Sequence, residues 1–269
     1  MKIEQAKQLT EQAFDKLIQA LEAGKSETLK VYLATMSRFH RYSFGNIMLI
    51  AFQRPSATRV AGFNTWKSLG RFVMKGEKGI MILAPIIATR KNTDDKGDES
   101  TLQEAALAGV KPVYVWDESQ TDGKPLAELA AVTGNPCNYT DPLTAYEGRL
   151  GIALEYSPDI APAKGLSHGG KITLLPDLSP AESFSVLVHE VSHELLHRNE
   201  RRAKTNRTIR ETEAEAVAFV VCQAIGLETN GSSADYIQSW RGDKQTLTEG
   251  LHFVQQTASQ ILTAISPGE

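Results

Sequence analysis

A helix that is predicted to begin at Ser179 constrains this chain more than any other feature of its sequence. Ser179 is a favoured N-cap residue, Pro180 suits the first helical position, and Glu182 completes a capping-box pattern. The helix is expected to run to about residue 198. Its apolar residues recur at helical spacing, which predicts a buried face. They are Phe184, Leu187, Val188, Val191 and Leu195.

The same helix carries the sequence His189-Glu190-Val191-Ser192-His193. Residues four apart on a helix share a face and lie about 6 Å apart, so the two imidazoles can bind one Zn²⁺. Glu190 would then lie beside the open position of the metal, where it can act as a general base. The pattern predicts His189 and His193 as metal ligands and Glu190 as the catalytic residue.

A catalytic zinc needs a third protein ligand. His197 lies eight residues after the first histidine, about 12 Å along the helix axis, so it cannot close the site and is expected to be a partly buried residue at the helix end. A second predicted helix, residues 208–225, begins with several acids. Glu213 is the expected ligand because its helical neighbours at i+3, i+4 and i+7 are apolar. Glu211 and Glu215 remain open as alternatives.

Basic residues are concentrated in one segment of the first half of the chain. The formal net charge is -3, but residues 30–91 contain eleven Lys or Arg and one acid, Glu77. Such an excess attracts polyanions, and interleaved aromatic residues offer stacking surfaces for the bases of a single strand. Phe52 and Phe63 are expected in the core. The candidate DNA contacts are Arg38, Arg41, Tyr42, Asn46, Trp66, Lys67, Arg71, Lys75 and Lys78.

Hydrophobic periodicity predicts an α+β fold with two domains, residues 1–138 and 139–269. The boundary is placed in a turn-rich region, and the second domain is expected to be mostly helical with a small sheet. The polar segment 92–101 is expected to be an exposed, mobile loop. Further helices are expected over residues 3–22, 27–36, 42–53, 65–69 and 244–265, strands over residues 79–88, 112–116 and 171–175, and a short strand or turn over residues 59–63.

Several classes of protein are not expected. No apolar run approaches the roughly 18 residues that a membrane span needs, and residues 1–7 lack the apolar region of a signal peptide. The two cysteines, Cys137 and Cys222, form no framework spacing. These observations predict a reduced, cytoplasmic protein without a membrane partner.

Two parts of the chain resemble known families. Residues 183–219, with HEVSHELLH followed by ETEAEAVAF, are similar to the gluzincin-like ImmA/IrrE-type zinc metallopeptidases. Residues 42–46 (YSFGN), 61–71 (AGFNTWKSLGR) and 75–79 (KGEKG) resemble the single-stranded-DNA-binding domain of ArdC-type antirestriction proteins. The resemblance implies one Zn²⁺ per chain with Glu213 as third ligand, single-stranded DNA and a protein substrate as partners, and an origin on conjugative plasmids or other mobile elements.

Three functions remain open from the sequence. The first is an antirestriction protein with a DNA-binding domain and a zinc metallopeptidase domain. The second is an ImmA/IrrE-like peptidase that cleaves a repressor, with the basic region as an adaptor for a protein partner. The third is a non-enzymatic DNA-binding protein in which zinc only stabilises the fold.

Overall fold

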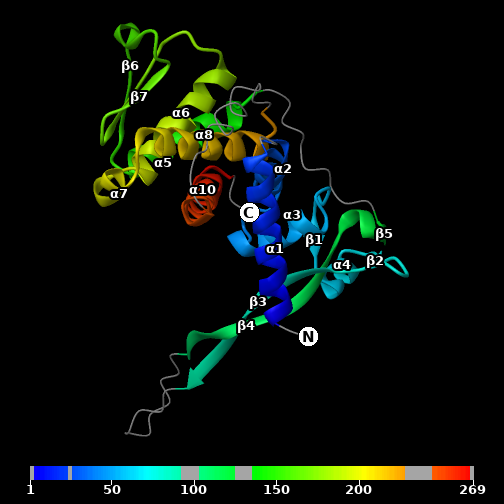
Figure 1. Cartoon of the computed structure of the whole chain (residues 1–269). Helices are drawn as coiled ribbons and strands as arrows, with labels where there is room; N and C mark the ends of the chain where they lie inside the picture. The colour runs from blue at the N-terminus through cyan, green and yellow to red at the C-terminus, as the bar shows by residue number, and fades with distance from the viewer. Residues whose placement is uncertain (1–2, 24–25, 92–102, 125–134, 228–243, 267–269) are drawn as a thin grey trace, which may run out of the picture. The chain divides into compact units, whose positions relative to one another are not determined.

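The computed structural model describes residues 3–23, 26–91, 103–124, 135–227 and 244–266 (Figure 1). Contacts divide the chain into two compact units, Met1–Asp15 with Met48–Pro125, and Lys16–Ile47 with Leu126–Glu269. Both units combine helices with small sheets, which confirms the predicted α+β class. The two units are not continuous in sequence. The expected domains, 1–138 and 139–269, stay a prediction.

The first unit is built around two long antiparallel strands, β3 (Ile80–Lys91) and β4 (Gln103–Asp117), which form an extended ribbon in Figure 1. The short strand β1 (Val60–Ala61) pairs with the end of β4, so the order is β1-β4-β3. Strands β2 (Arg71–Val73) and β5 (Thr121–Gly123) form a separate antiparallel pair. The predicted strands are thus present, and the ribbon extends beyond their predicted ends.

The carboxylate of Asp117 joins two segments of this unit. Its side chain accepts hydrogen bonds from the backbone amides of Thr58 at 2.7 Å, Arg59 at 3.2 Å and Ser119 at 3.1 Å. Burial by itself would raise the pKa of Asp117, but a hydrogen bond from the Ser119 hydroxyl together with these backbone hydrogen bonds outweighs burial and lowers it. The ionised carboxylate therefore ties the segment before β1 to the end of β4.

Helix α8 (Arg207–Ala224) is the centre of the second unit. It is contacted by α6 (Pro180–Leu196), α10 (Lys244–Ile265) and α2 (Ser26–Arg38), and α10 is in turn contacted by α5 (Cys137–Arg149). Small side chains let neighbouring helix axes approach closely. The small residues buried on α8 are Ala214, Ala216 and Ala218.

A three-stranded sheet covers another side of α6. Strand β6 (Ala153–Tyr156) is parallel to β8 (Lys171–Leu174), and β7 (Gly165–Ser167) is antiparallel to β8, in the order β6-β8-β7. Both β7 and β8 contact α6. Strand β8 agrees with the predicted strand at 171–175, whereas β6 and β7 were not predicted.

The start of helix α6 follows the capping signal in the sequence. Ser179 Oγ accepts a hydrogen bond from the amide of Glu182 at 3.3 Å, so α6 begins where predicted. The Glu182 carboxylate pairs with Lys164 and does not return to the cap. The other helices are α1 (Ile3–Glu22), α3 (Phe44–Gln53), α4 (Phe63–Ser68) and α7 (Asn199–Lys204), with short 3₁₀ turns η1 (Glu118–Gln120) and η2 (Pro158–Ile160).

Two expectations need separate comment. The short helix α4 begins after Gly62, which makes no side-chain cap, so it starts before the Asn64 that was expected to cap it. The loop expected at 92–101 lies outside the described residues.

Within the described part of the chain, no helix combines the length and the apolar character that crossing a bilayer requires.

Glu147 on α5 is an exception to the usual pairing of buried polar groups. The residue is 1% exposed, and both carboxylate oxygens lack a hydrogen-bond partner among the described residues. Burial raises the pKa of Glu147 to about 8. The carboxyl group is therefore protonated in the folded state at neutral pH.

We expect Glu147→Gln to stabilise the protein increasingly as the pH rises from about 5 to 8. The folded state retains this proton up to about pH 8, whereas the unfolded chain loses it near an ordinary pKa of about 4.3, so wild-type stability falls across this window. Urea melts at the two pH values should show a relative loss on the order of 2–4 kcal/mol for the wild type. Glu155→Gln, at an exposed position on β6, is the control. Equal pH dependence of the wild type and Glu147→Gln would contradict the assignment.

Candidate metal centre and pocket

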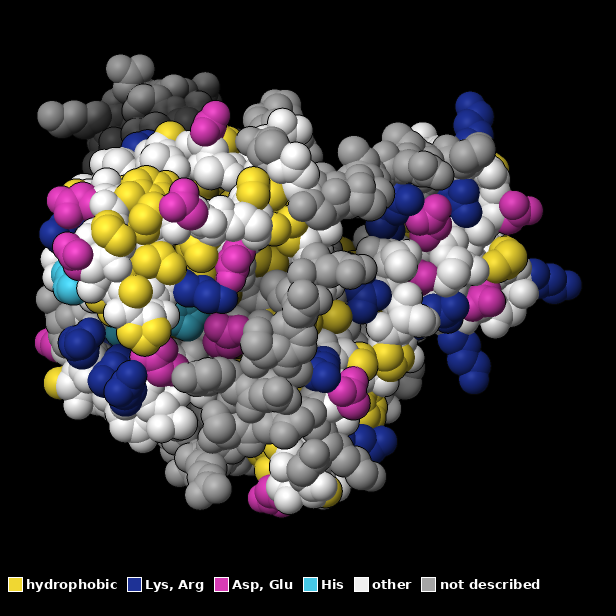
Figure 2. All heavy atoms as spheres, turned by 90° about the horizontal axis from the view of Figure 1, so that it is seen from above, with side chains coloured by type: hydrophobic (Ala, Val, Ile, Leu, Met, Phe, Trp, Pro, Cys, Tyr) yellow, Lys and Arg dark blue, Asp and Glu magenta, His cyan; other side chains and the backbone are white. Residues whose placement is uncertain are grey.

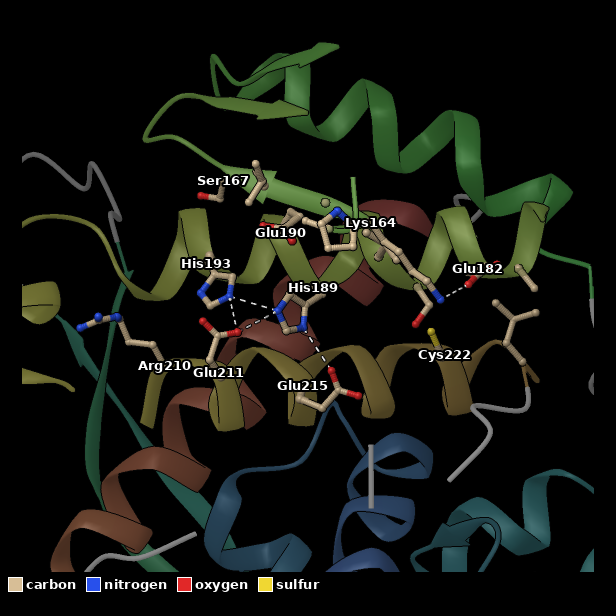
Figure 3. A pocket seen from close by; sticks show the side chains of 18 of the residues that line it. Lys164, Ser167, Glu182, His189, Glu190, His193, Arg210, Glu211, Glu215 and Cys222 are labelled. Atoms are coloured by element: carbon tan, nitrogen blue, oxygen red, sulfur yellow. Dashed lines mark hydrogen bonds and ion pairs between the residues drawn. The ribbon is translucent and has the colours of Figure 1, made fainter. Parts of the chain in front are cut away.

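Helix α6 directs its two motif histidines toward α8. In Figure 3, His189 and His193 point from α6 to Glu211 and Glu215, which point back from α8. The Nε2 atoms of the two histidines are 3.1 Å apart. The i, i+4 spacing thus has the predicted effect of bringing two imidazole nitrogens to one place.

Glu211 completes the cluster. Its Oε2 lies 3.6 Å from the Nε2 of His189 and 3.6 Å from the Nε2 of His193. Ligand atoms about 2.0–2.1 Å from a tetrahedral ion are about 3.3–3.4 Å from one another, close to the observed separations. The two histidines and Glu211 therefore form a group that could hold a divalent metal ion.

Glu213, the expected third ligand, does not lie in this cluster. Its Oε2 is 2.9 Å from His197 Nε2, and Arg201 donates to both of its oxygens at 2.8 and 2.7 Å. Each residue of a helix is rotated by about 100° from the one before, so side chains two residues apart point in nearly opposite directions. Glu211 and Glu213 therefore cannot both face α6 in the same way. The apolar neighbours of Glu213 correctly indicated burial, but burial on α8 and proximity to the histidine pair are different properties.

The remaining nitrogen of each motif histidine also has a partner. His189 Nδ1 lies 3.2 Å from Oε2 of Glu215, and His193 Nδ1 lies 3.0 Å from Nδ1 of His197. His197 forms the C-cap of α6 and is 2% exposed, so it is a helix-end residue as expected, but fully buried. Both Nε2 atoms thus face the cluster while both Nδ1 atoms face other residues.

The carboxylates make the cluster attractive to positive charge. Burial lowers the pKa of His189, but hydrogen bonds with Glu211 and Glu215 outweigh burial and raise it to about 9. The pKa of Glu211 is lowered by hydrogen bonds from the two motif histidines. The positive charge that these carboxylates favour can be supplied either by a proton on a histidine or by a divalent metal ion bound to the cluster.

Glu190 is held on the side of α6 that faces strand β7. It is 7% exposed, and burial raises its pKa. The backbone of β7 approaches closely because Gly165 has no side chain: a Cβ there would lie 2.8 Å from Glu190 Cγ and 2.6 Å from Val186 Cγ1. The position of Glu190 therefore depends on a glycine in the adjacent strand.

A second carboxylate, Glu194, anchors the turn between β7 and β8 on α6. Its oxygens accept hydrogen bonds from the amides of Gly169 and Gly170 at 2.8 Å each, and also from Ser167 and Arg198. Both glycines have positive φ values, 72° and 103°, which only glycine adopts readily. This contact fixes β7 over α6.

A pocket of about 1230 Å³ opens between α6, α8 and β7. Figure 2 shows one face of the molecule, on which histidine side chains reach the surface among acidic and basic side chains. The lining of the pocket includes the three candidate ligands and Glu190, strand β7, and a group of arginines on α7 and at the start of α8. These are Arg202, Arg207 and Arg210.

The structure corrects one of the predicted DNA contacts. Trp66 is 2% exposed, and its Nε1 donates to the Trp116 carbonyl at 2.8 Å, so its ring is a core anchor and offers no face to a base. Arg71 uses its guanidinium on Thr121 and the Lys124 carbonyl, which fastens β2 to β5. Asn46 is also buried, with 8% exposure.

The other predicted contacts lie in two different compact units. Arg38 and Arg41 are exposed and Tyr42 is partly exposed in the second unit. Lys67, Lys75 and Lys78 are exposed in the first unit. Their role in DNA binding stays a prediction.

Exposed aromatic residues in the first unit were not identified from the sequence. Phe63 is 51% exposed, Phe72 57% and Tyr114 44%, so Phe63 is not the core residue that was expected. Phe63 also meets the ring of Trp116 at 6.1 Å in an edge-to-face contact. The sequence contains one indication that Phe63 is exposed, because polar residues follow it in a strongly basic segment.

Comparison with known proteins supports the resemblance. Residues 7–116 match the family described as the N-terminal domain of anti-restriction factor ArdC. A crystal structure of the antirestriction ArdC protein from the R388 plasmid, in metal-free form, has 20% sequence identity and a TM-score of 0.57, covering 96% of this chain and 97% of that one. The Mn(II)-bound structure of the R388 protein has 20% identity and a TM-score of 0.56, over 97% and 99% of the two chains. The chain thus has an ArdC-type N-terminal domain and the ArdC fold.

A longer relative has no assigned activity. Uncharacterized protein pXO2-81 of Bacillus anthracis is 24% identical over 308 aligned positions. The alignment includes 97% of this chain and 52% of the relative, so the chain spans about half the length of that protein.

We expect Gly165→Ala to destabilise the protein by about 1–3 kcal/mol, because the added methyl group would overlap Val186 and Glu190. Gly148→Ala is the matched control. Gly148 is exposed in α5, and a Cβ there meets nothing within 4 Å, so alanine should stabilise the helix by about 0.5–1 kcal/mol. Thermal melts of both variants would measure the difference. A Gly165→Ala variant as stable as Gly148→Ala would contradict the close approach of β7.

Proposed function

We propose that this ArdC-type chain is an antirestriction protein of a conjugative plasmid or related mobile element, and that it binds single-stranded DNA and carries a zinc-dependent metallopeptidase centre. The observation that carries the enzymatic part is the convergence of His189, His193 and Glu211 in a pocket that also contains Glu190. The match of residues 7–116 to the ArdC N-terminal domain supports the antirestriction part.

The DNA-binding part is supported by exposed cations and aromatic rings in the first unit. Lys67, Lys75 and Lys78 can neutralise phosphates, and Phe63 and Phe72 can stack on bases. Stacking is tolerant of sequence because every base has a π-face. We therefore propose binding without strong sequence preference and assign the stacking role to these phenylalanines in place of Trp66.

The metal part is supported by the chemistry of the donors. Two imidazole nitrogens and one carboxylate oxygen form the His₂Glu set of catalytic zinc sites, which keep one position open. The ArdC protein of the R388 plasmid, which has the same fold, has a crystal structure with Mn(II) bound. We propose one Zn²⁺ per chain, with Glu211 replacing Glu213 as the third ligand.

The proposed reaction is hydrolysis of a peptide bond. A divalent metal ion at this site would supply Lewis-acid polarisation of the substrate carbonyl. Glu190 accepts a proton from the attacking water on its carboxylate and passes it to the leaving amine nitrogen, and its raised pKa favours this transfer. Strand β7 lines the pocket at the edge of its sheet, where an extended peptide can pair as an additional strand.

The alternative of a purely structural zinc is less well supported. Structural zinc sites generally have four protein ligands. The candidate cluster in the described residues has three, and it opens into a pocket.

We expect the wild type to retain about one Zn²⁺ per chain after dialysis, and His193→Ala and Glu211→Ala to lose it, because each removes a donor of a three-ligand site. Elemental analysis of the full-length proteins measures the ratio. Glu200→Ala, at a 90% exposed side chain on α7, should keep the metal. A Glu211→Ala protein with full zinc content would refute the ligand assignment.

The Glu190→Gln variant separates the catalytic role of Glu190 from metal binding. This variant should keep the metal and the fold and lose any hydrolysis of a protein substrate, because Glu190 is not a ligand. Full cleavage by Glu190→Gln would rule out the general-base role. Loss of cleavage with retained antirestriction would place the protection in DNA binding.

We expect the full-length protein to bind single-stranded oligonucleotides more tightly than duplex, with affinity that falls as salt rises. Phe63→Ala and Phe72→Ala should each weaken binding by roughly 1–3 kcal/mol without changing the salt dependence. Replacing Lys67, Lys75 and Lys78 by alanine should flatten the slope of log K against log salt by about 0.7 for each lost phosphate contact.

Fluorescence anisotropy over a salt series provides the measurement. Tyr156→Ala is the control, because Tyr156 is a 60% exposed aromatic residue on β6 in the second unit. Loss of affinity in Tyr156→Ala equal to that in Phe63→Ala would indicate that the first-unit aromatics have no special role. No affinity of the wild type at 50 mM salt would favour the repressor-cleaving function.

A further inference from the structure

We propose that His197, Glu213 and Arg201 form a positioning network that holds the ring of His193 with its Nε2 lone pair directed toward the metal. The inference rests on the metal centre proposed above and extends it to residues that are not ligands. The network runs from His193 Nδ1 to His197 Nδ1 at 3.0 Å, from His197 Nε2 to Glu213 at 2.9 Å, and from Glu213 to Arg201 at 2.7 and 2.8 Å.

The direction of each hydrogen bond follows from the Arg201 end of the network. Arg201 can only donate, and the Glu213 carboxylate can only accept. His197 Nε2 must therefore donate to Glu213, which leaves a lone pair on Nδ1 of a neutral His197. That lone pair accepts the Nδ1 proton of His193, and Nε2 of His193 is left unprotonated. This is the tautomer that a metal ligand requires.

The network is rigid as well as correctly protonated. The side chains of His197 and Glu213 are 0% and 1% exposed, so neither can exchange its partner for water. The Arg201 guanidinium is held from the other side by the ring of Phe253 on α10, 3.8 Å from the ring centroid. Three helices besides α6 (α7, α8 and α10) therefore determine the orientation of one imidazole.

A contribution to fold stability would not by itself explain why these buried charged groups are present. Replacing a buried ion pair by apolar residues of similar volume is often neutral or stabilising. By contrast, the partners of ligating histidines commonly set metal affinity, with changes of 10–100-fold on mutation. His189 is oriented differently, by the partly exposed Glu215, whose side chain is 21% exposed.

The test measures Zn²⁺ affinity of the full-length protein by competition with a chromophoric chelator, together with melting of the metal-free protein. His197→Phe keeps the ring volume and removes both hydrogen bonds, and it should weaken Zn²⁺ binding by about 10–100-fold. His197→Gln keeps one acceptor and one donor and should recover most of that loss. His40→Phe, which replaces another partly buried histidine of the second unit, should leave the affinity unchanged.

The outcomes distinguish this inference from the metal centre itself. A wild type that binds no Zn²⁺ overturns the metal centre. A wild type that binds Zn²⁺ and a His197→Phe variant that binds it equally well overturn the positioning network, even if the metal-free variant melts at a lower temperature. If His197→Phe does not fold, Arg201→Met replaces it, since Arg201 is 21% exposed and its loss should weaken Zn²⁺ binding by about tenfold. Unchanged affinity in a folded Arg201→Met protein then counts against the network.

Discussion

The close packing of helix α6 on helix α8 is the contact on which the candidate metal centre depends. Two histidines one helical turn apart on α6 supply two donors, but the third donor belongs to another helix and is useful only if that helix lies near. The buried alanines of α8 allow this approach. Because the two helices pack over their length, each glutamate of α8 meets a different part of α6: Glu211 and Glu215 meet the motif histidines, and Glu213 meets the helix end at His197.

The interior of the second unit contains several carboxylates with different roles. Glu213 and Glu194 are almost fully buried, and each is satisfied by several donors, so both can remain ionised inside the protein. Glu190 is buried next to the histidine pair, and its raised pKa suits a group that exchanges protons. Glu147 has no such partners among the described residues and is the carboxyl group that stays protonated at neutral pH.

Helices were predicted from the sequence more accurately than strands. The predicted helices over 3–22 and 244–265 agree with α1 and α10, because long apolar periodicity is a strong signal. Strands β2, β5 and β7 have three residues each, too few to show alternation, and the pairing of β2 with β5 joins segments that are distant along the chain. Helix α7 was missed because Arg201, Arg202 and Lys204 give its segment no apolar face.

The sequence by itself determined the helix that begins at Ser179, the pair of histidines on one face of it, and the ArdC-type character of residues 7–116. The first two of these properties depend on residues close together in the chain. Only the tertiary structure decided that Glu211 approaches the histidines, that Glu213 pairs with His197, that Trp66 is buried and that Phe63 is exposed. An apolar neighbourhood in the sequence indicates that a side chain is buried, but which groups it meets there depends on elements that come from elsewhere in the chain.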